Sequence, residues 1–254
     1  MEVGSMLTYE ALRLLLGPLY SLHLRMRVEG AENVPGEGGA LIVSNHRSYA
    51  DPIVIALGIE RFVNFAAGSH LYLVPGSRHI FNLIGFFKMD IYGGEGGDAS
   101  LSEGARLLRG GELVGIFPEG IESFMHVYSA SRIAAFKTGF VKLALENKVP
   151  VIPVAIAASE EKQMLPRLPG ALVSAFVKHP DAGKGIELIT YRHVTLRVGR
   201  PVDLAPFHGQ EETKSVMDEV AAKIRRIVTR LYDGDDLDRH MHGTEPFDFA
   251  TDRV

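Results

Sequence analysis

Short apolar runs alternate with segments of helical periodicity along this chain, and this alternation constrains the fold more than any other feature. The apolar runs are residues 40–44, 112–117 and 150–156, and the helical segments are residues 52–58, 99–109 and 138–147. A run without polar positions is typical of a strand that is buried on both faces. The order therefore predicts a single α/β domain, with a mainly parallel mixed sheet and helices on both faces.

The remaining elements complete this domain. Further strands are expected at residues 25–30, 61–66, 89–92, 173–176, 187–191 and 193–198, with a helical or mixed segment at 79–87. Residues 210–232 predict a long amphipathic helix, because apolar residues recur there at helical spacing. We expect an N-terminal helix over residues 1–24, one main domain over 25–232 and an acidic, flexible tail over 233–254.

Composition excludes several classes of function. The 254 residues, 46% of them hydrophobic, suit one globular domain, and the net charge of −4 argues against a nucleic-acid partner. The chain has no cysteine, which excludes disulfides and thiolate metal sites. His240 and His242 in the polar tail are taken as an incidental pair, so no metal site is expected. No phosphate-binding P-loop or Gly-x-Ser-x-Gly elbow is present.

The N-terminal segment is rich in leucine but interrupted. Glu10, Arg13 and the pair Gly17-Pro18 argue against a transmembrane span, and no signal-peptide pattern is seen. An apolar stripe at helical spacing consists of Leu12, Leu15, Leu16, Leu19 and Leu22. This stripe either packs on the protein's own core or lies in a membrane surface, where the following Arg25 and Arg27 would meet anionic head groups.

The sequence Asn45-His46-Arg47-Ser48-Tyr49-Ala50-Asp51 follows the first buried run directly. Asp51 precedes Pro52 and an apolar segment, so it is expected to be a helix N-cap with proline at the first helical position. A carboxylate five residues from a histidine across such a turn can hold one ring nitrogen and leave the other to accept a proton. An ordinary turn histidine beside a capping aspartate is the alternative.

Three later segments lower the weight of that alternative. They are residues 113–120, which end in Phe117-Pro118-Glu119-Gly120, the basic segment 136–145, and the strand 149–156 with the sequence Val-Pro-Val-Ile-Pro-Val-Ala-Ile. With the histidine motif, these blocks resemble the glycerolipid acyltransferase family, the PlsC-type enzymes that are similar to 1-acylglycerol-3-phosphate acyltransferase. The resemblance covers roughly residues 25–230, and the order of the blocks makes it specific.

The resemblance implies O-acyl transfer from a thioester to a hydroxyl without an acyl-enzyme, in lipid biosynthesis. His46 is expected to be the general base, with Asp51 orienting it. The residues expected to bind substrate are Asn45, Arg47, Phe117, Pro118, Glu119, Gly120 and Lys137. No cofactor is implied; acyl-CoA or acyl carrier protein would be the co-substrate. A turn-forming, solvated carboxylate is the alternative for Glu119, and a solvated side chain is the alternative for Lys137.

Two positions depart from the family pattern. An arginine usually follows the aspartate of the second block, where this chain has Ile91 after Asp90, and Glu122 stands where the third block usually has an arginine. Both arginines are associated with the acceptor's phosphate, which a carboxylate would repel. We therefore expect an acceptor whose head group is not a phosphate monoester, unless Arg47, Lys88, Arg132 and Lys137 rebuild the phosphate site.

Two other functions fit the same residues. The same dyad in a thioesterase would activate water in place of an alcohol, and a lipid-binding protein could retain the fold without activity. The expected partners are an acyl donor thioester, a lipid acceptor and a membrane surface. The expected location is cytoplasmic and peripheral, on the inner face of the cell membrane.

Overall fold

The computed structural model describes residues 3–73, 76–89, 95–120, 123, 133–163, 167–177, 179–211, 213–235, 240–241 and 247–248. Within these residues the strands are β1 Arg27–Glu29, β2 Ala40–Ser44, β3 Val63–Gly68, β4 Phe86–Met89, β5 Leu113–Ile116, β6 Val151–Gln163, β7 Ile189–Val198, β8 Val202–Asp203 and β9 Phe247–Asp248. The α-helices are α1 Val3–His23, α2 Asp51–Gly58, α3 Ser77–Leu83, α4 Glu95–Arg109, α6 Gly139–Asn147, α7 Gly170–Phe176 and α8 Lys214–Asp233.

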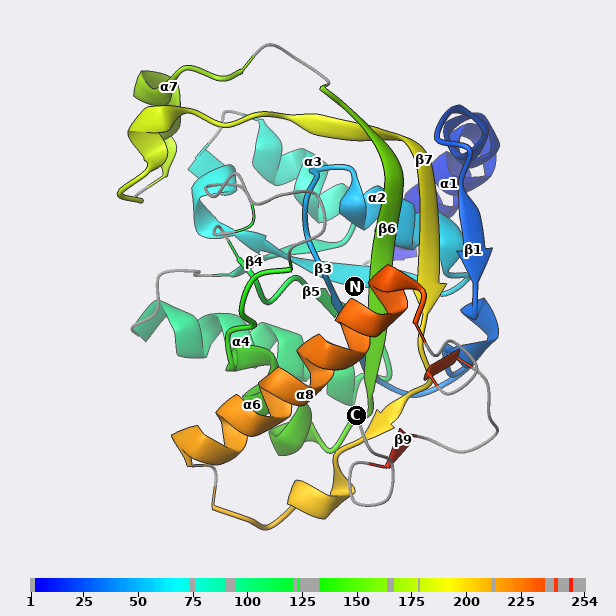
Figure 1. The fold of residues 1–254 in the computed structure, drawn as a ribbon, viewed down its shortest axis with the longest axis vertical. Coiled ribbons are helices and arrows are strands. Elements are labelled where there is room, and N and C mark those ends of the chain that lie inside the picture. Colours follow the sequence, from blue (N-terminus) through cyan, green and yellow to red (C-terminus); the bar gives the residue numbers. More distant parts are fainter. Residues whose placement is uncertain are drawn as a thin grey trace.

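The described strands form one mixed sheet, in the order β1-β7-β6-β2-β5-β3-β4 (Figure 1). The central pairs β6/β2, β2/β5, β5/β3 and β3/β4 are parallel, and β7 runs antiparallel to β6. The prediction of a mainly parallel mixed sheet is confirmed. As a consequence, β2, β3 and β5 all end at one edge of the sheet, where α/β folds place their chemistry.

Helices cover both faces of this sheet, as expected. On one face, Leu41 and Val43 of β2 pack in a cluster with buried side chains of α4, α6 and α8. On the other face, Ala40 and Ile42 pack with residues of α2. Figure 1 shows α8 in front of the sheet, with α1 and α2 behind it. Because alternate side chains of β2 enter different clusters, this strand is apolar from Ala40 to Val43.

Three strand predictions need correction. Residues 173–176, expected to be a strand, belong to α7, for which Pro169 is the N-cap residue. The expected strands 187–191 and 193–198 are one continuous strand, β7, with register shifts against β6 near Glu160. A β-bulge of this kind adds a residue without ending the strand, so the burial pattern changes phase within it. The mixed segment 79–87 divides into the end of α3 and the start of β4.

The N-terminal helix ends in a way that places an arginine at the sheet edge. Arg25 has a left-handed φ of 42°, and the N–H groups of Arg25 and Met26 donate to the carbonyls of Leu22 and Ser21, respectively. This is a Schellman C-terminus, in which glycine normally occupies the left-handed position. Lys148 has φ 51° at the equivalent position after α6. Among the described residues, no helix is long and apolar enough to cross a membrane.

Most of the segment 233–254, expected to be a flexible tail, lies outside the described residues. The parts that are described pack against the domain. His240 and Met241 are buried, and the carbonyl of His240 accepts the N–H of Arg200. The short strand β9 pairs with β8. Residues 240–241 and 247–248 of the segment are therefore packed against the domain.

Candidate active site

The histidine and aspartate of the Asn-His-x4-Asp motif form a dyad at the carboxyl end of β2. His46 Nδ1 lies 2.7 Å from Asp51 Oδ2, and the Asp51 side chain is fully buried. The His46 side chain retains 14% exposure and lines a cavity of about 280 Å³. A carboxylate that holds Nδ1 fixes the orientation of the ring and directs Nε2 away from the carboxylate.

Asp51 was expected to cap α2, and this expectation is wrong. The helix begins at Asp51 itself, with Ala50 as the N-cap residue. Its carboxylate instead turns toward the preceding loop, where Oδ2 accepts the N–H groups of Arg47 at 2.7 Å and Ser48 at 2.8 Å. The carboxylate therefore binds these two N–H groups and the ring nitrogen of His46, and it does not cap the first turn of α2.

Tyr191 of β7 completes the surroundings of Asp51 and was not predicted. Its hydroxyl donates to Asp51 Oδ1 at 2.5 Å, and the side chain is buried. Burial raises the pKa of Tyr191 well above its usual value, and the neighbouring carboxylate acts in the same direction. The phenol therefore remains a hydrogen-bond donor at physiological pH. Tyr191 is 140 residues from Asp51 in the chain, and no local pattern connects the two.

An aromatic stack supports the other side of the dyad. The ring of Phe117 lies against that of His46, with centroids 4.1 Å apart and planes 18° apart. Phe65 of β3 stacks in turn on Phe117, at 5.9 Å. Phe117 directly follows β5, so the sheet order β2-β5-β3 brings the three rings together at one edge. The stack limits rotation of the imidazole about its side-chain bonds.

Glu119 is buried and has two backbone partners. Its carboxylate oxygens accept the N–H of His46 at 2.8 Å and the N–H of Ala134 at 2.7 Å. Burial raises the pKa of Glu119, and these two hydrogen bonds oppose that increase. The side chain is 3% exposed, so the solvated alternative is wrong. In this geometry Glu119 positions the backbone of the loop that carries His46.

Asn45 and Arg47 also make contacts within the protein. The Asn45 amide exchanges two hydrogen bonds with the backbone of Ile156, and so continues the pairing of β2 with β6. Arg47 forms a two-point ion pair with Glu161, at 2.6 Å and 3.0 Å. Both expected substrate residues are thus engaged on the β6 side of the loop.

Two of the expected residues after β5, Phe117 and Gly120, line the cavity of His46. Gly120 has φ 63°. A Cβ added to Gly120 would lie 3.3 Å from Lys137 Nζ, so the ammonium group passes directly over this glycine. The carbonyl of Pro118 accepts the N–H of Lys137 at 3.0 Å. Lys137 itself is exposed, as the alternative of a solvated side chain expects.

A second histidine, His70, lines the same cavity and was not predicted. It follows β3 in a short 3-10 helix, at the sheet edge that also carries His46. His70 is 8% exposed, and its buried Nδ1 has no hydrogen-bond partner among the residues that the structure describes. Burial lowers the pKa of His70, so the imidazole is neutral at physiological pH.

Of the positions that bear on a phosphate site, Asp90, Ile91, Glu122 and Arg132 lie outside the described residues, and Lys88 is exposed on β4.

Comparison with known proteins identifies the family. The model of the family described as Acyltransferase matches residues 25–157. An uncharacterized protein of Mycobacterium tuberculosis (strain H37Rv) is 31% identical over 59% of this chain and 42% of its own length. A 1-acyl-sn-glycerol-3-phosphate acyltransferase of Bacillus subtilis is 24% identical over 84% of this chain and 93% of its own length.

A solved structure agrees with the fold. The PlsC acyltransferase of Thermotoga maritima superposes with a TM-score of 0.62, at 20% identity, over 91% of this chain and 80% of the other. The chain spans less than half the length of the mycobacterial relatives that it matches. The α/β sheet and the His/Asp dyad at its carboxyl edge place the chain in the class of α/β proteins whose site is suited to general-base chemistry. Within this class, the chain belongs to the acyltransferase family.

We predict that Glu119→Gln destabilises the protein and lowers kcat. An amide has one acceptor oxygen in place of two, so one of the two backbone N–H groups loses its partner, at a cost of about 1–3 kcal/mol. The measurements are urea unfolding and steady-state kinetics, with Glu146→Gln on the exposed face of α6 as the matched control. A raised KM for the acceptor, with unchanged unfolding, would instead assign Glu119 to substrate binding.

Proposed function

We propose that the protein is an O-acyltransferase that moves a fatty acyl group from acyl-CoA or acyl carrier protein to a hydroxyl of a glycerolipid or lyso-lipid. The observation that carries this proposal is the 2.7 Å contact between His46 Nδ1 and the buried carboxylate of Asp51. A histidine held in this way, beside an apolar cavity, is equipped to take a proton from an alcohol.

The proposed reaction is a direct displacement. His46 Nε2 removes the hydroxyl proton as the acceptor oxygen attacks the thioester carbonyl. The tetrahedral intermediate then collapses, the carbon–sulfur bond breaks, and the imidazolium returns the proton to the leaving thiolate. Asp51 stabilises the imidazolium that forms in the first step. The products are an ester and a free thiol, and no side chain of the protein is acylated.

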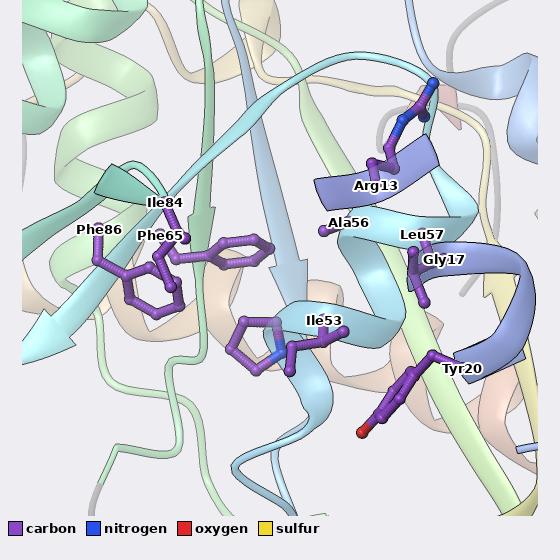
Figure 2. Close-up of a pocket in the computed structure, with 10 residues that line it drawn as sticks. Arg13, Gly17, Tyr20, Ile53, Ala56, Leu57, Phe65, Ile84 and Phe86 are labelled. Carbon is purple, nitrogen blue, oxygen red and sulfur yellow. The ribbon is translucent and has the colours of Figure 1, made fainter. Parts of the chain in front are cut away.

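Two adjoining apolar cavities supply a candidate groove for the acyl chain. The cavity of His46 shares Pro52, Ile53, Ile84 and Phe86 with a second cavity of about 270 Å³. Figure 2 shows this second cavity, where Gly17 and Tyr20 of α1 face Ala56 and Leu57 of α2. A chain bound there would extend from the dyad toward α1. Each buried methylene would contribute about 0.8 kcal/mol to binding.

A membrane surface is the proposed source of the acceptor. Leu14, Leu15, Leu19 and Leu22 of α1 are each about 70% exposed or more. Large exposed apolar groups on one helix are typical of a helix that lies in the membrane interface. The proposed location is therefore peripheral, on the inner face of the cell membrane.

One prediction of this proposal tests His46 as the general base. His46→Ala is expected to lower kcat by about 10²–10⁴-fold, because that is the usual contribution of a general base. Asp51→Asn is expected to cost no more than loss of the base. The assay follows thiol release from acyl-CoA, with and without acceptor lipids. Turnover near that of the wild type in His46→Ala would refute the mechanism, and thiol release that no acceptor accelerates would identify a thioesterase.

The second prediction concerns the acceptor. We expect poor use of lysophosphatidate relative to a lyso-lipid whose head group is not a phosphate monoester, because Ile91 and Glu122 replace the usual cations. One lost charge-assisted contact is worth roughly 1.5–3 kcal/mol, or about ten- to a hundredfold in kcat/KM. Ile91→Arg combined with Glu122→Arg should raise lysophosphatidate use selectively. A wild type that prefers lysophosphatidate over the whole panel would contradict this prediction.

The third prediction concerns the groove. Ala56→Phe places a ring in the cavity beside α1 and should shorten the preferred acyl chain. Each methylene that no longer fits should lower kcat/KM by about fourfold, while short acyl-CoA substrates retain their activity. Ala222→Phe on the exposed face of α8 is the matched control. Equal losses for short and long chains would place the acyl group elsewhere.

A further inference from the structure

A third cavity, with polar walls, lies at the edge of the sheet, outside the site described above. It has a volume of about 420 Å³ and spans the edge strand β1 and the next two strands of the sheet, β7 and β6. Its lining residues are Arg25, Arg27, Ser159, His193, Val194 and Thr195. None of them is acidic, and the register of β1 places Arg27 directly beside Thr195.

The hydrogen bonds of this cavity leave it positively charged. Arg25 Nη1 lies 3.0 Å from His193 Nε2, and a guanidinium can only donate, so this nitrogen accepts. His193 Nδ1 then donates to Glu160 at 3.1 Å, and Glu160 also pairs with Arg192. The side chain of Arg27 makes no ion pair or hydrogen bond with any residue that the structure describes. The single carboxylate of the network is thus shared, while two guanidinium groups face the cavity.

Arg25 occupies a backbone position that normally favours glycine. It is the left-handed residue of the Schellman turn after α1, with φ 42°. The turn itself needs no side chain there, and a side chain adds strain. What the arginine contributes is its guanidinium, which lies against His193 and inside the cavity.

The cavity lies at the same edge of the sheet as the dyad and next to the exposed leucines. β1 and β7 begin at the edge where β2 and β6 end, because β7 runs antiparallel to β6 and parallel to β1. Leu22, which is 76% exposed, precedes Arg25 by three residues. An apolar row and a basic cavity therefore adjoin one another, as anionic lipids require of a peripheral protein.

We propose that this cavity binds the phosphodiester head group of an anionic phospholipid, and that it orients the catalytic edge of the sheet toward the membrane. The two guanidinium groups offer forked donors to phosphate oxygens, and the hydroxyls of Ser159 and Thr195 offer further donors. The adjoining leucines favour a lipid over a soluble phosphate. The inference rests on the proposed function in one respect, the supply of acceptor from a membrane.

The test is sedimentation with vesicles of phosphatidylcholine alone or mixed with phosphatidylglycerol. Arg25→Gly and Arg27→Gln should each weaken binding to the mixed vesicles by roughly fivefold, the usual effect of one basic residue at such a surface. Lys148→Gly is the matched control, since it removes one positive charge from the same type of helix end. Arg109→Gln, at an exposed position of α4, is the control for Arg27→Gln. Neither control should lose binding selectively.

Three results would overturn the proposal. The first is an equal loss for the controls, which would show attraction by overall charge alone. The second is competition by inorganic phosphate with no dependence on phosphatidylglycerol. The third is a raised KM for acyl-CoA with unchanged vesicle binding, which would assign the cavity to the donor. Arg25→Gly should not lower Tm, because glycine relieves the turn. Vesicle binding requires no turnover, so it can also be measured in His46→Ala, and a failure of the proposed activity leaves this result interpretable.

Discussion

The buried carboxylate of Asp51 is the constraint on which the site depends. An ionised carboxylate without water is costly unless it is hydrogen-bonded, and Asp51 has four donors. They are the ring of His46, the N–H groups of Arg47 and Ser48, and the hydroxyl of Tyr191. These groups come from the loop after β2 and from β7, while the carboxylate belongs to α2. One side chain therefore holds three segments together and fixes the orientation of the His46 ring as a consequence.

The parts of this arrangement that are local in sequence could be predicted, and the distant parts could not. The buried strands are visible because the central sheet is covered on both faces, so β5, the first four residues of β2 and the first eight of β6 are apolar. The dyad is visible because His46 and Asp51 are five residues apart. Tyr191 contacts Asp51 only because β7 folds back on β6 with a bulge, and no periodicity specifies that register. His70 was missed for the same reason, since its place beside His46 depends on the order of strands in the sheet.

Glu119 illustrates a different limit of sequence reasoning. The motif indicates that a carboxylate is needed at a strand end, but it does not show which way the carboxylate points. In the structure it points inward, to the backbone of His46 and Ala134, because Gly120 turns the chain with a left-handed φ. The role of Glu119 is then analogous to that of Asp51. Each buried carboxylate stabilises a loop at the catalytic edge by accepting backbone N–H groups that would otherwise lack partners.

The polarity of the sheet explains why the separate features meet at one edge. Parallel strands carry His46, His70 and Phe117 past their carboxyl ends, while the antiparallel return through β7 brings the beginning of β1 to the same edge. The helix that precedes β1 must therefore end there, and its last turn delivers Arg25 beside His193 and leaves Leu22 exposed. Its middle packs against α2 and closes one side of the apolar groove. In the proposed function, this one helix would line the acyl groove with its middle and face the membrane with its exposed leucines.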